Sequence, residues 1–207
     1  MPPDYLISAL VTLFVVVDPI GLAPTFLGVT EGMSTAHRRS VAKRAALIAG
    51  LVLIGAALIG HWLLTYLGIS LPAFRIAGGL LLFSIASEMV FGVRIERQTK
   101  SAEQAMEERV RNIAAFPLAI PLTAGPGAIT ATVLLAGQAS WRPLLLASLI
   151  GVIIVVALAC YCVFLLAGAI GRLIGITGST VLSRLLGVIL AALAVQYIID
   201  GVRAVLT

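Results

Sequence analysis

Long apolar runs alternate with short polar segments along the whole chain. About 20 apolar residues are enough for a helix to cross the hydrocarbon core of a bilayer. Six runs meet this length, and we expect spans at residues 6–27, 44–67, 73–92, 113–136, 144–170 and 182–199. The pattern therefore predicts an all-α polytopic membrane protein whose 207 residues form a single transmembrane domain.

Two of these runs, the first and the fourth, contain helix-breaking residues near their middle. The first run carries Asp18, Pro19, Gly21 and Pro24, and the fourth carries Pro117, Pro121, Gly125, Pro126 and Gly127. Proline lacks an N–H and collides with the carbonyl four residues back, so we expect helices 1 and 4 to break near the midplane. Broken backbone at that depth persists only where it is buried in protein or lines a wet cavity.

The two halves of the chain repeat a short motif. Phe74-Arg75-Ile76-Ala77-Gly78 resembles Ser183-Arg184-Leu185-Leu186-Gly187, and both Arg and Gly are displaced by 109 positions. Each half contains an odd number of spans, so the halves must have opposite orientations in the membrane. We expect two inverted three-helix repeats, at about 1–92 and 113–207, joined by a cytoplasmic loop at about 93–112. Matching breaks in such repeats point to a transporter's binding site.

The charges indicate an orientation in the membrane. Only 11% of the residues are charged and 60% are hydrophobic, so the net charge of +5 indicates basic cytoplasmic loops and not a nucleic-acid partner. Eleven of the 14 basic residues fall after the first, third and fifth spans: Arg38, Arg39, Lys43, Arg44, Arg94, Arg97, Lys100, Arg109, Arg111, Arg172 and Arg184. The positive-inside rule therefore predicts both termini outside, in the periplasm if the membrane is a bacterial inner membrane.

The broken segments have the residue types of helix starts. Asp18-Pro19 and Gly125-Pro126 each read as an N-cap followed by the first helical residue. Two such N-terminal ends facing one cavity favour an anion, because their N–H groups are unsatisfied and the helix dipole is positive there. The Asp18 carboxylate would satisfy its own helix end, whereas the end at Gly125 and Gly127 stays open.

This difference suggests a site for a small zwitterion. The open end would hold a substrate carboxylate, and Asp18 would face an amine or a proton. The predicted substrate-binding residues are Asp18, Pro19, Gly21, Thr123, Gly125, Pro126, Gly127 and Thr130. The structural alternatives are that Asp18 is only a helix cap and that the glycines serve only close helix packing.

Four further polar residues in the spans are candidates for coupling or gating. Glu88 either carries a coupling proton or extends its carboxylate to the interface. Arg75 and Arg184 open equivalent helices and would either form symmetric gates or extend to lipid headgroups. Gln196, near Asp200, has the same ambiguity. We predict no metal site and no cofactor, and the absence of a His-Glu pair or convincing nucleophile argues against an enzyme.

Three motifs resemble the MarC family of bacterial inner-membrane proteins. They are Asp18-Pro19-Ile20-Gly21, Phe74-Arg75-Ile76-Ala77-Gly78-Gly79, and Phe116-Pro117-Leu118-Ala119-Ile120-Pro121 followed by Ala124-Gly125-Pro126-Gly127. Gln196 also resembles the family, and the similarity covers nearly the whole chain. The resemblance implies a fold distantly related to the LysE-type exporters and, for some relatives, transport of glycine and alanine.

We therefore expect a secondary transporter for small neutral amino acids, with import or export left open. The partners would be a zwitterionic substrate and membrane lipid, and a homo-oligomer is also left open. The alternatives are a cation, metal or drug exporter of related fold, or a membrane subunit without transport activity.

Overall fold

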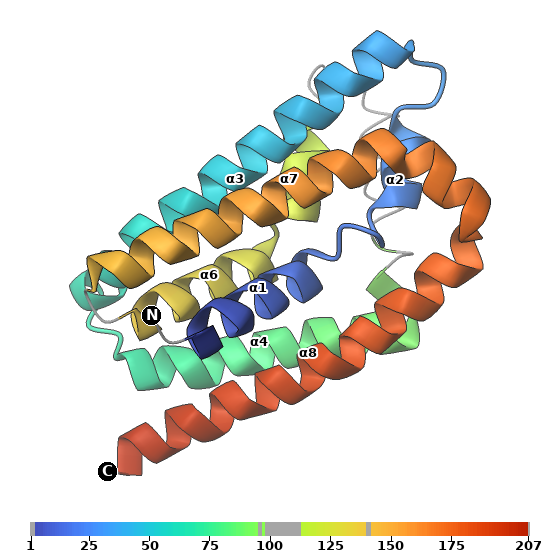
Figure 1. Cartoon of the computed structure of the whole chain (residues 1–207). Coiled ribbons are helices and arrows are strands. Elements are labelled where there is room, and N and C mark those ends of the chain that lie inside the picture. Colours follow the sequence, from blue (N-terminus) through green and yellow to red (C-terminus); the bar gives the residue numbers. More distant parts are fainter. Residues whose placement is uncertain (1–2, 95–96, 98–112, 140–141, 207) are drawn as a thin grey trace.

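The structure is a computed structural model that describes residues 3–94, 97, 113–139 and 142–206. All regular elements in this part of the chain are helices, arranged as an elongated bundle (Figure 1). They are α1 (Pro3–Val17), α2 (Ala23–Val29), α3 (Thr35–Tyr66), α4 (Leu71–Phe91), η1 (Ala114–Thr123), α6 (Pro126–Gln138), α7 (Pro143–Leu173) and α8 (Gly175–Leu206). Most of the predicted cytoplasmic loop, residues 95–96 and 98–112, lies outside the described residues.

The helices confirm an all-α membrane protein. By length and composition, α3, α4, α7 and residues 177–206 of α8 can each cross a membrane. The pair η1 and α6, bent by 58°, provides a fifth crossing if it is one span. The first predicted span, 6–27, is divided into α1, with 15 residues, and α2, with 7 residues. The described chain thus gives four to five candidate spans, and the breaks predicted in the first and fourth runs are present.

Two helices are longer than the hydrophobic pattern predicts. Helix α3 begins at Thr35 rather than residue 44, because the Ser34 side chain accepts a hydrogen bond from the His37 N–H at 3.3 Å. Its first turns carry basic side chains that project from the apolar bundle, so hydropathy alone places them in a loop. Helix α8 begins at Gly175 rather than residue 182, and its polar first turns pack against the turn after α1 through Ser179 and Ser183.

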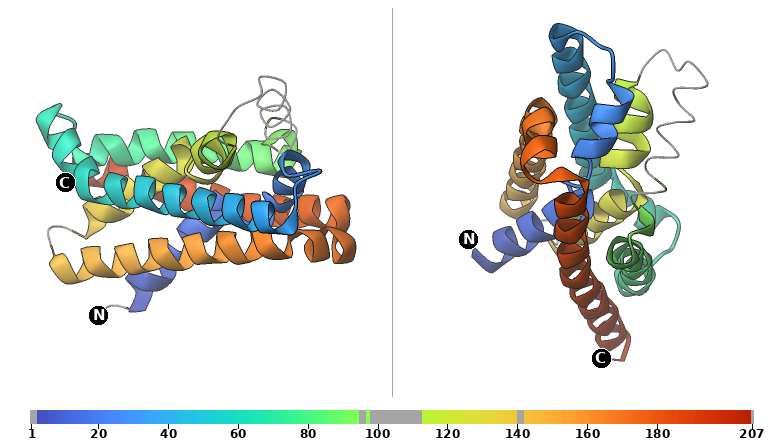
Figure 2. Two further views of the ribbon diagram at one scale, coloured as in Figure 1. Left: turned by 90° about the horizontal axis from the view of Figure 1, so that it is seen from above. Right: turned by 90° about the vertical axis from the view of Figure 1, so that its right-hand side faces the viewer.

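Helices α4 and α8 run antiparallel and pack closely along the length of α4 (Figures 1 and 2). A Cβ atom placed on Gly79 would lie 2.8 Å from the Ala194 carbonyl oxygen and 2.6 Å from an Ile198 side-chain carbon. One on Gly187 would lie 2.8 Å from the Met89 Cβ atom. Glycine lets the two backbones approach, which is the usual basis of helix association in lipid.

Two other pairs are also antiparallel. Helix α3 packs along α7, where a Cβ atom on Gly50 would be 3.4 Å from Ala157 (Figure 1). Helix α1 packs along α6, and the Tyr5 hydroxyl donates a 3.0 Å hydrogen bond to the Leu135 carbonyl. The three pairs together enclose the core of the bundle.

Both ends of the chain lie at the same end of the bundle, together with the α3–α4 and α6–α7 connections (Figures 1 and 2). The opposite end contains the start of α3, the end of α4 and the α7–α8 junction. The basic residues described at this opposite end are Arg38, Arg39, Lys43, Arg44, Arg94, Arg97, Arg172 and Arg184. Charge is therefore concentrated away from the termini, which is the asymmetry on which the predicted orientation depends.

Candidate functional site

The fourth hydrophobic run is interrupted between η1 and α6. Inside η1, Phe116 (φ −135°, ψ 127°) and Ile120 (φ −128°, ψ 125°) have extended backbones. Each precedes a proline, and the ring of a proline disfavours helical conformation in the residue before it. The chain then bends by 58° into α6 in the interior of the bundle.

The N-terminus of α6 opens at this bend, as the sequence predicts. Gly125 is the N-cap, Pro126 lies in the first turn, and no side chain of the described residues caps this end. A Cβ atom on Gly125 would collide with the Pro121 carbonyl oxygen, so the tight turn requires glycine. The N–H groups of Gly127 and Ala128 lie in the first turn, where an α-helix has no intrahelical acceptor to offer.

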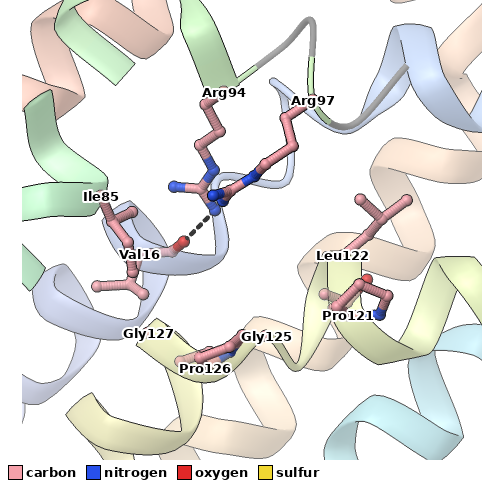
Figure 3. A pocket seen from close by; sticks show the side chains of 11 residues that line it. Val16, Ile85, Arg94, Arg97, Pro121, Leu122, Gly125, Pro126 and Gly127 are labelled. Carbon is pink, nitrogen blue, oxygen red and sulfur yellow. Dashed lines mark hydrogen bonds between the residues drawn. The ribbon is translucent and has the colours of Figure 1, made fainter. Parts of the chain in front are cut away.

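A cavity of about 250 Å³ lies against this helix end (Figure 3). The segment from Pro121 to Ala128 forms one wall, including the predicted residues Thr123, Gly125, Pro126 and Gly127. The opposite wall consists of Val16 at the end of α1, Ile85 of α4, and Arg94 and Arg97 beyond α4. Two guanidinium groups therefore face an uncapped helix N-terminus.

Arg94 is buried, with 8% of its surface exposed, although it follows the end of α4. Gly92 ends α4 in the left-handed conformation, at φ +81°, and lets the chain turn so that Arg94 points back into the bundle. Its Nη2 donates to the Val16 carbonyl at 2.7 Å, and its Nη1 donates to the Met89 sulfur at 3.0 Å. The expectation that Arg94 belongs to a solvated loop is wrong, because its side chain is buried.

Arg94 interacts electrostatically with three neighbouring charges, those of Asp18, Arg97 and Glu88. Burial lowers the pKa of the Arg94 guanidinium below its ordinary value, and the Asp18 carboxylate opposes this effect. The nearby Arg97 guanidinium adds to the lowering, because two like charges oppose each other. Arg97 in turn pairs with Glu88 of α4 at 2.7 Å, and its side chain is 59% exposed. The cavity wall thus combines a buried cation with a half-exposed, paired one.

The first break has a different structure from the one that the sequence predicts. Asp18 follows α1 directly and has a left-handed backbone, with φ +52°. Its Oδ1 accepts a hydrogen bond from the Gly21 N–H at 3.0 Å, and its Oδ2 accepts one from the Ser183 hydroxyl at 2.6 Å. Helix α2 begins later, at Ala23, with Leu22 as its N-cap. The prediction that Asp18-Pro19 opens a half-helix is wrong, because the carboxylate closes a turn instead.

The two breaks therefore contribute opposite helix ends to the cavity. Val16, in the last turn of α1, lines the cavity, whereas Asp18, Pro19 and Gly21 lie in the buried turn that follows. The C-terminal end of a helix is partly negative and the N-terminal end partly positive. The prediction of two N-terminal ends facing one cavity is wrong, and the cavity has a dipolar environment.

A protein-family model described as "MarC family integral membrane protein" matches residues 4–206 of the chain. The chain belongs to the MarC family. It is 37% identical to a UPF0056 membrane protein of Archaeoglobus fulgidus, over 96% of this chain and 92% of the relative. It is also 37% identical to one of Methanocaldococcus jannaschii, over the full length of both. Similarity to the UPF0056 membrane protein YhcE of Escherichia coli is 32% identity, over 93% and 89%. No solved structure matches the chain.

Of the remaining predicted residues of this MarC-family chain, Thr123 lines the cavity, whereas Thr130 and Gln196 are not among the residues that line it. Thr130 is one turn further along α6, where its methyl carbon would be 2.8 Å from a Cβ atom on Gly78. Thr123 lines the cavity but donates its hydroxyl to the Leu118 carbonyl at 2.8 Å. Gln196 donates to Asp200 at 2.7 Å on α8. Substrate binding by Thr123 and Thr130, and coupling or gating by Gln196, remain predictions.

Arg75 and Arg184 occupy equivalent positions at opposite ends of the α4–α8 pair. Arg184 lies beside Gly92, where a Cβ atom would be 3.3 Å from the Arg184 guanidinium. Arg75 lies beside Gly201, where a Cβ atom would be 3.2 Å from the Arg75 Cβ atom. Their predicted roles as gates are untested. The residues that are 109 positions apart in the sequence therefore have matching neighbours at the two ends of the α4–α8 pair.

The sequence interpretation missed two groups of residues in this MarC-family site. Arg94 and Arg97 lie among other basic residues, so their charge suggests only a loop. Ser179 and Ser183 hold the turn after α1, and Ser179 donates to the Ile20 carbonyl at 3.2 Å. Their spacing of four residues places both on one face of a helix, which is a signal only once α8 is known to begin at Gly175.

Proposed function

We propose that this MarC-family protein is a secondary transporter for small neutral amino acids such as glycine and alanine. The substrate would bind in the cavity between the end of α1 and the start of α6. The observation that carries the proposal is the arrangement of this cavity, which lies between helix ends of opposite polarity and beside two guanidinium groups.

A zwitterion matches this arrangement at both of its ends. The carboxylate would lie toward the α6 N-terminus and the arginines, where N–H donors are available. The ammonium group would lie toward the C-terminal end of α1, where carbonyl groups carry partial negative charge. The Val16 carbonyl already accepts from Arg94, so the ammonium would face the other carbonyls of this helix end. Asp18 would contribute indirectly, through its charge next to Arg94, rather than by touching the amine.

The size and charge of the cavity also favour this function over the alternatives. Its volume of about 250 Å³ is smaller than the about 300–1,000 Å³ typical of sites for drug-sized ligands. Its charged side chains are both cations, which disfavour a metal ion or an organic cation at the same place. These features support a small carboxylate-bearing substrate over a drug or metal exporter.

The helix pairing supports two inverted repeats of three helices. Helix α1 with α2 would correspond to η1 with α6, α3 to α7, and α4 to α8. Helix α3 packs antiparallel against α7 and α4 against α8, and the two broken elements meet through α1 and α6, as expected for halves of opposite orientation. The cavity then lies where the two broken elements meet. This is the usual place of a substrate site in transporters built from such repeats.

Purified protein in liposomes would test the function directly. We expect counterflow of radiolabelled glycine and alanine into liposomes loaded with the same amino acid, and none into empty liposomes. We also expect these amino acids to raise the melting temperature, because a ligand of the folded state stabilises it. Stabilisation by zinc or by tetraphenylphosphonium, without any effect of amino acids, would support the exporter alternatives instead.

The second prediction concerns orientation in the cytoplasmic membrane. We propose that the basic end of the bundle faces the cytoplasm and that both termini face outward. The test uses a protein from which the native Cys160 and Cys162 have been removed. A single cysteine is then placed either at Glu31, on the basic end, or at Arg142, on the end that holds the termini. In intact cells, an impermeant maleimide should label position 142 but not position 31. The reverse pattern would contradict the orientation, and labelling of both would contradict the number of crossings.

A further inference from the structure

The charge on Arg94 lacks a direct counter-ion within the described chain. Asp18 is close enough to interact with it, but no described carboxylate forms an ion pair with its guanidinium, and Glu88 pairs with Arg97 instead. A charged side chain buried away from water is costly unless it is paired and hydrogen-bonded. Burying a charge is tolerated when an oppositely charged partner and further hydrogen bonds satisfy it. An anion in the adjacent cavity would provide that partner.

The geometry of Arg94 leaves donors for such an anion. A guanidinium group has five N–H donors in a planar fork. The bonds to Val16 and Met89 use two of them, which leaves three for acceptors outside the described protein groups. Figure 3 shows Arg94 and Arg97 extending toward the space that Gly125, Pro126 and Gly127 close from the other side. The two contacts to α1 and α4 also fix the direction of the fork.

We propose that Arg94 is the residue that binds the carboxylate of the substrate, together with the N–H groups at the start of α6. This inference rests on the proposed function for its substrate class, but it assigns the recognition to a residue outside the predicted membrane spans. Arg97 lines the same cavity and is held by Glu88, so it adds positive charge at the exposed edge of the site. The bidentate geometry of an arginine and a carboxylate selects planar acids over alcohols or amides.

The test compares Arg94→Gln, Arg94→Lys and a matched surface variant, Arg44→Gln, in purified full-length protein. Isothermal titration with glycine, glycinamide and acetate measures the dissociation constants. For glycine, we expect Arg94→Gln to raise the constant about tenfold or more, because a charge-assisted hydrogen bond is lost. Arg94→Lys keeps the positive charge but lacks the planar fork of donors. Its dissociation constant for glycine should fall between those of the wild type and Arg94→Gln. Arg44→Gln should behave as the wild type, and glycinamide should bind weakly to all four proteins.

The outcomes separate this inference from the proposed function. If the wild type binds glycine and Arg94→Gln binds it equally well, Arg94 does not hold the carboxylate, although amino acid transport stands. If the wild type binds acetate but not glycine, and Arg94→Gln loses acetate, the inference holds and the amino acid function fails. Binding of neither acid by the wild type would overturn both. If Arg94→Gln does not fold, wild-type affinity for glycine in Arg94→Lys would still count against a fork-shaped contact.

Discussion

Asparagine at position 18 should reduce glycine transport at least about tenfold while leaving a folded protein, because only the negative charge beside Arg94 is removed. Asparagine tolerates the left-handed backbone at φ +52°, and its side-chain oxygen can still accept from the Gly21 N–H. The Ser183 hydroxyl can turn from donor to acceptor at the other atom. The substitution therefore changes the electrostatic environment of Arg94. Arg94 would hold the substrate carboxylate with no negative charge of Asp18 to compete for it.

This prediction distinguishes two roles for Asp18. If Asp18 acts only through its charge on Arg94, Asp18→Asn should lose transport, but its dissociation constant for glycine should stay within about threefold of the wild-type value. If Asp18 touched the substrate amine, binding itself would weaken. Radiolabelled counterflow and isothermal titration on the same preparation would give both quantities. Asp18→Ala is the control for the turn, and its melting temperature should fall, because the Gly21 and Ser183 contacts disappear. Normal transport by Asp18→Asn would leave Asp18 a structural residue.

Side chains at Gly127 should exclude substrates in order of size. A Cβ atom there would collide with the end of the Ile85 side chain and would lie 3.3 Å from a methyl carbon of Val16. Both neighbours line the cavity, so Gly127→Ala should push Ile85 into the substrate space. We expect alanine to lose affinity before glycine does, and Gly127→Val to lose both by about tenfold or more, as in other tightly packed sites.

Two further variants make this prediction specific. Ile85→Val removes the carbon that the new side chain would meet, so adding it to Gly127→Ala should restore alanine binding. Gly151→Ala in α7 is the matched control, because a Cβ atom there meets nothing within 4 Å. At Gly21, by contrast, alanine would collide with the Asp18 carboxylate and should lower stability more than it changes selectivity. Unchanged affinities for both amino acids in Gly127→Val would show that this wall does not bound the substrate.

The break in the fourth run could be predicted because its causes are local. Proline restricts its own backbone and that of the residue before it, and glycine at position 125 permits a turn that any side chain would obstruct. The N-cap at Gly125 follows from the same few residues. Such features depend on neighbours in the sequence, so the pattern of residues is sufficient to locate them.

The geometry at Asp18 could not be predicted in the same way. An Asp-Pro pair suits both a helix start and a turn, because aspartate bonds readily to nearby backbone N–H groups in either case. The structure resolves the ambiguity through the Ser183 hydroxyl, which is 165 positions away in the sequence. That contact depends on how α8 packs against the end of α1, which no local pattern contains.

Arg94 shows the limit of an argument from charge counting. The positive-inside rule uses the number of basic residues in a loop and carries no information on where each side chain points. The direction of Arg94 is decided by the left-handed Gly92 and by acceptors on α1 and α4. The rule therefore remains useful for the orientation of the bundle, although it obscures a residue of the site.

The close contact between α4 and α8 also divides the bundle into stiff and yielding parts. Cβ atoms on Gly79, Gly187 and Gly201 would each lie about 3 Å from a backbone carbonyl of the facing helix, at 2.8, 3.1 and 2.9 Å. Few side chains separate these backbones, so this pair has little capacity to repack. The compliant points are the segments after α1 and before α6, where helical hydrogen bonding is interrupted. We expect the protein to bend at these segments when access to the cavity changes, while α4 and α8 move together as one rigid unit.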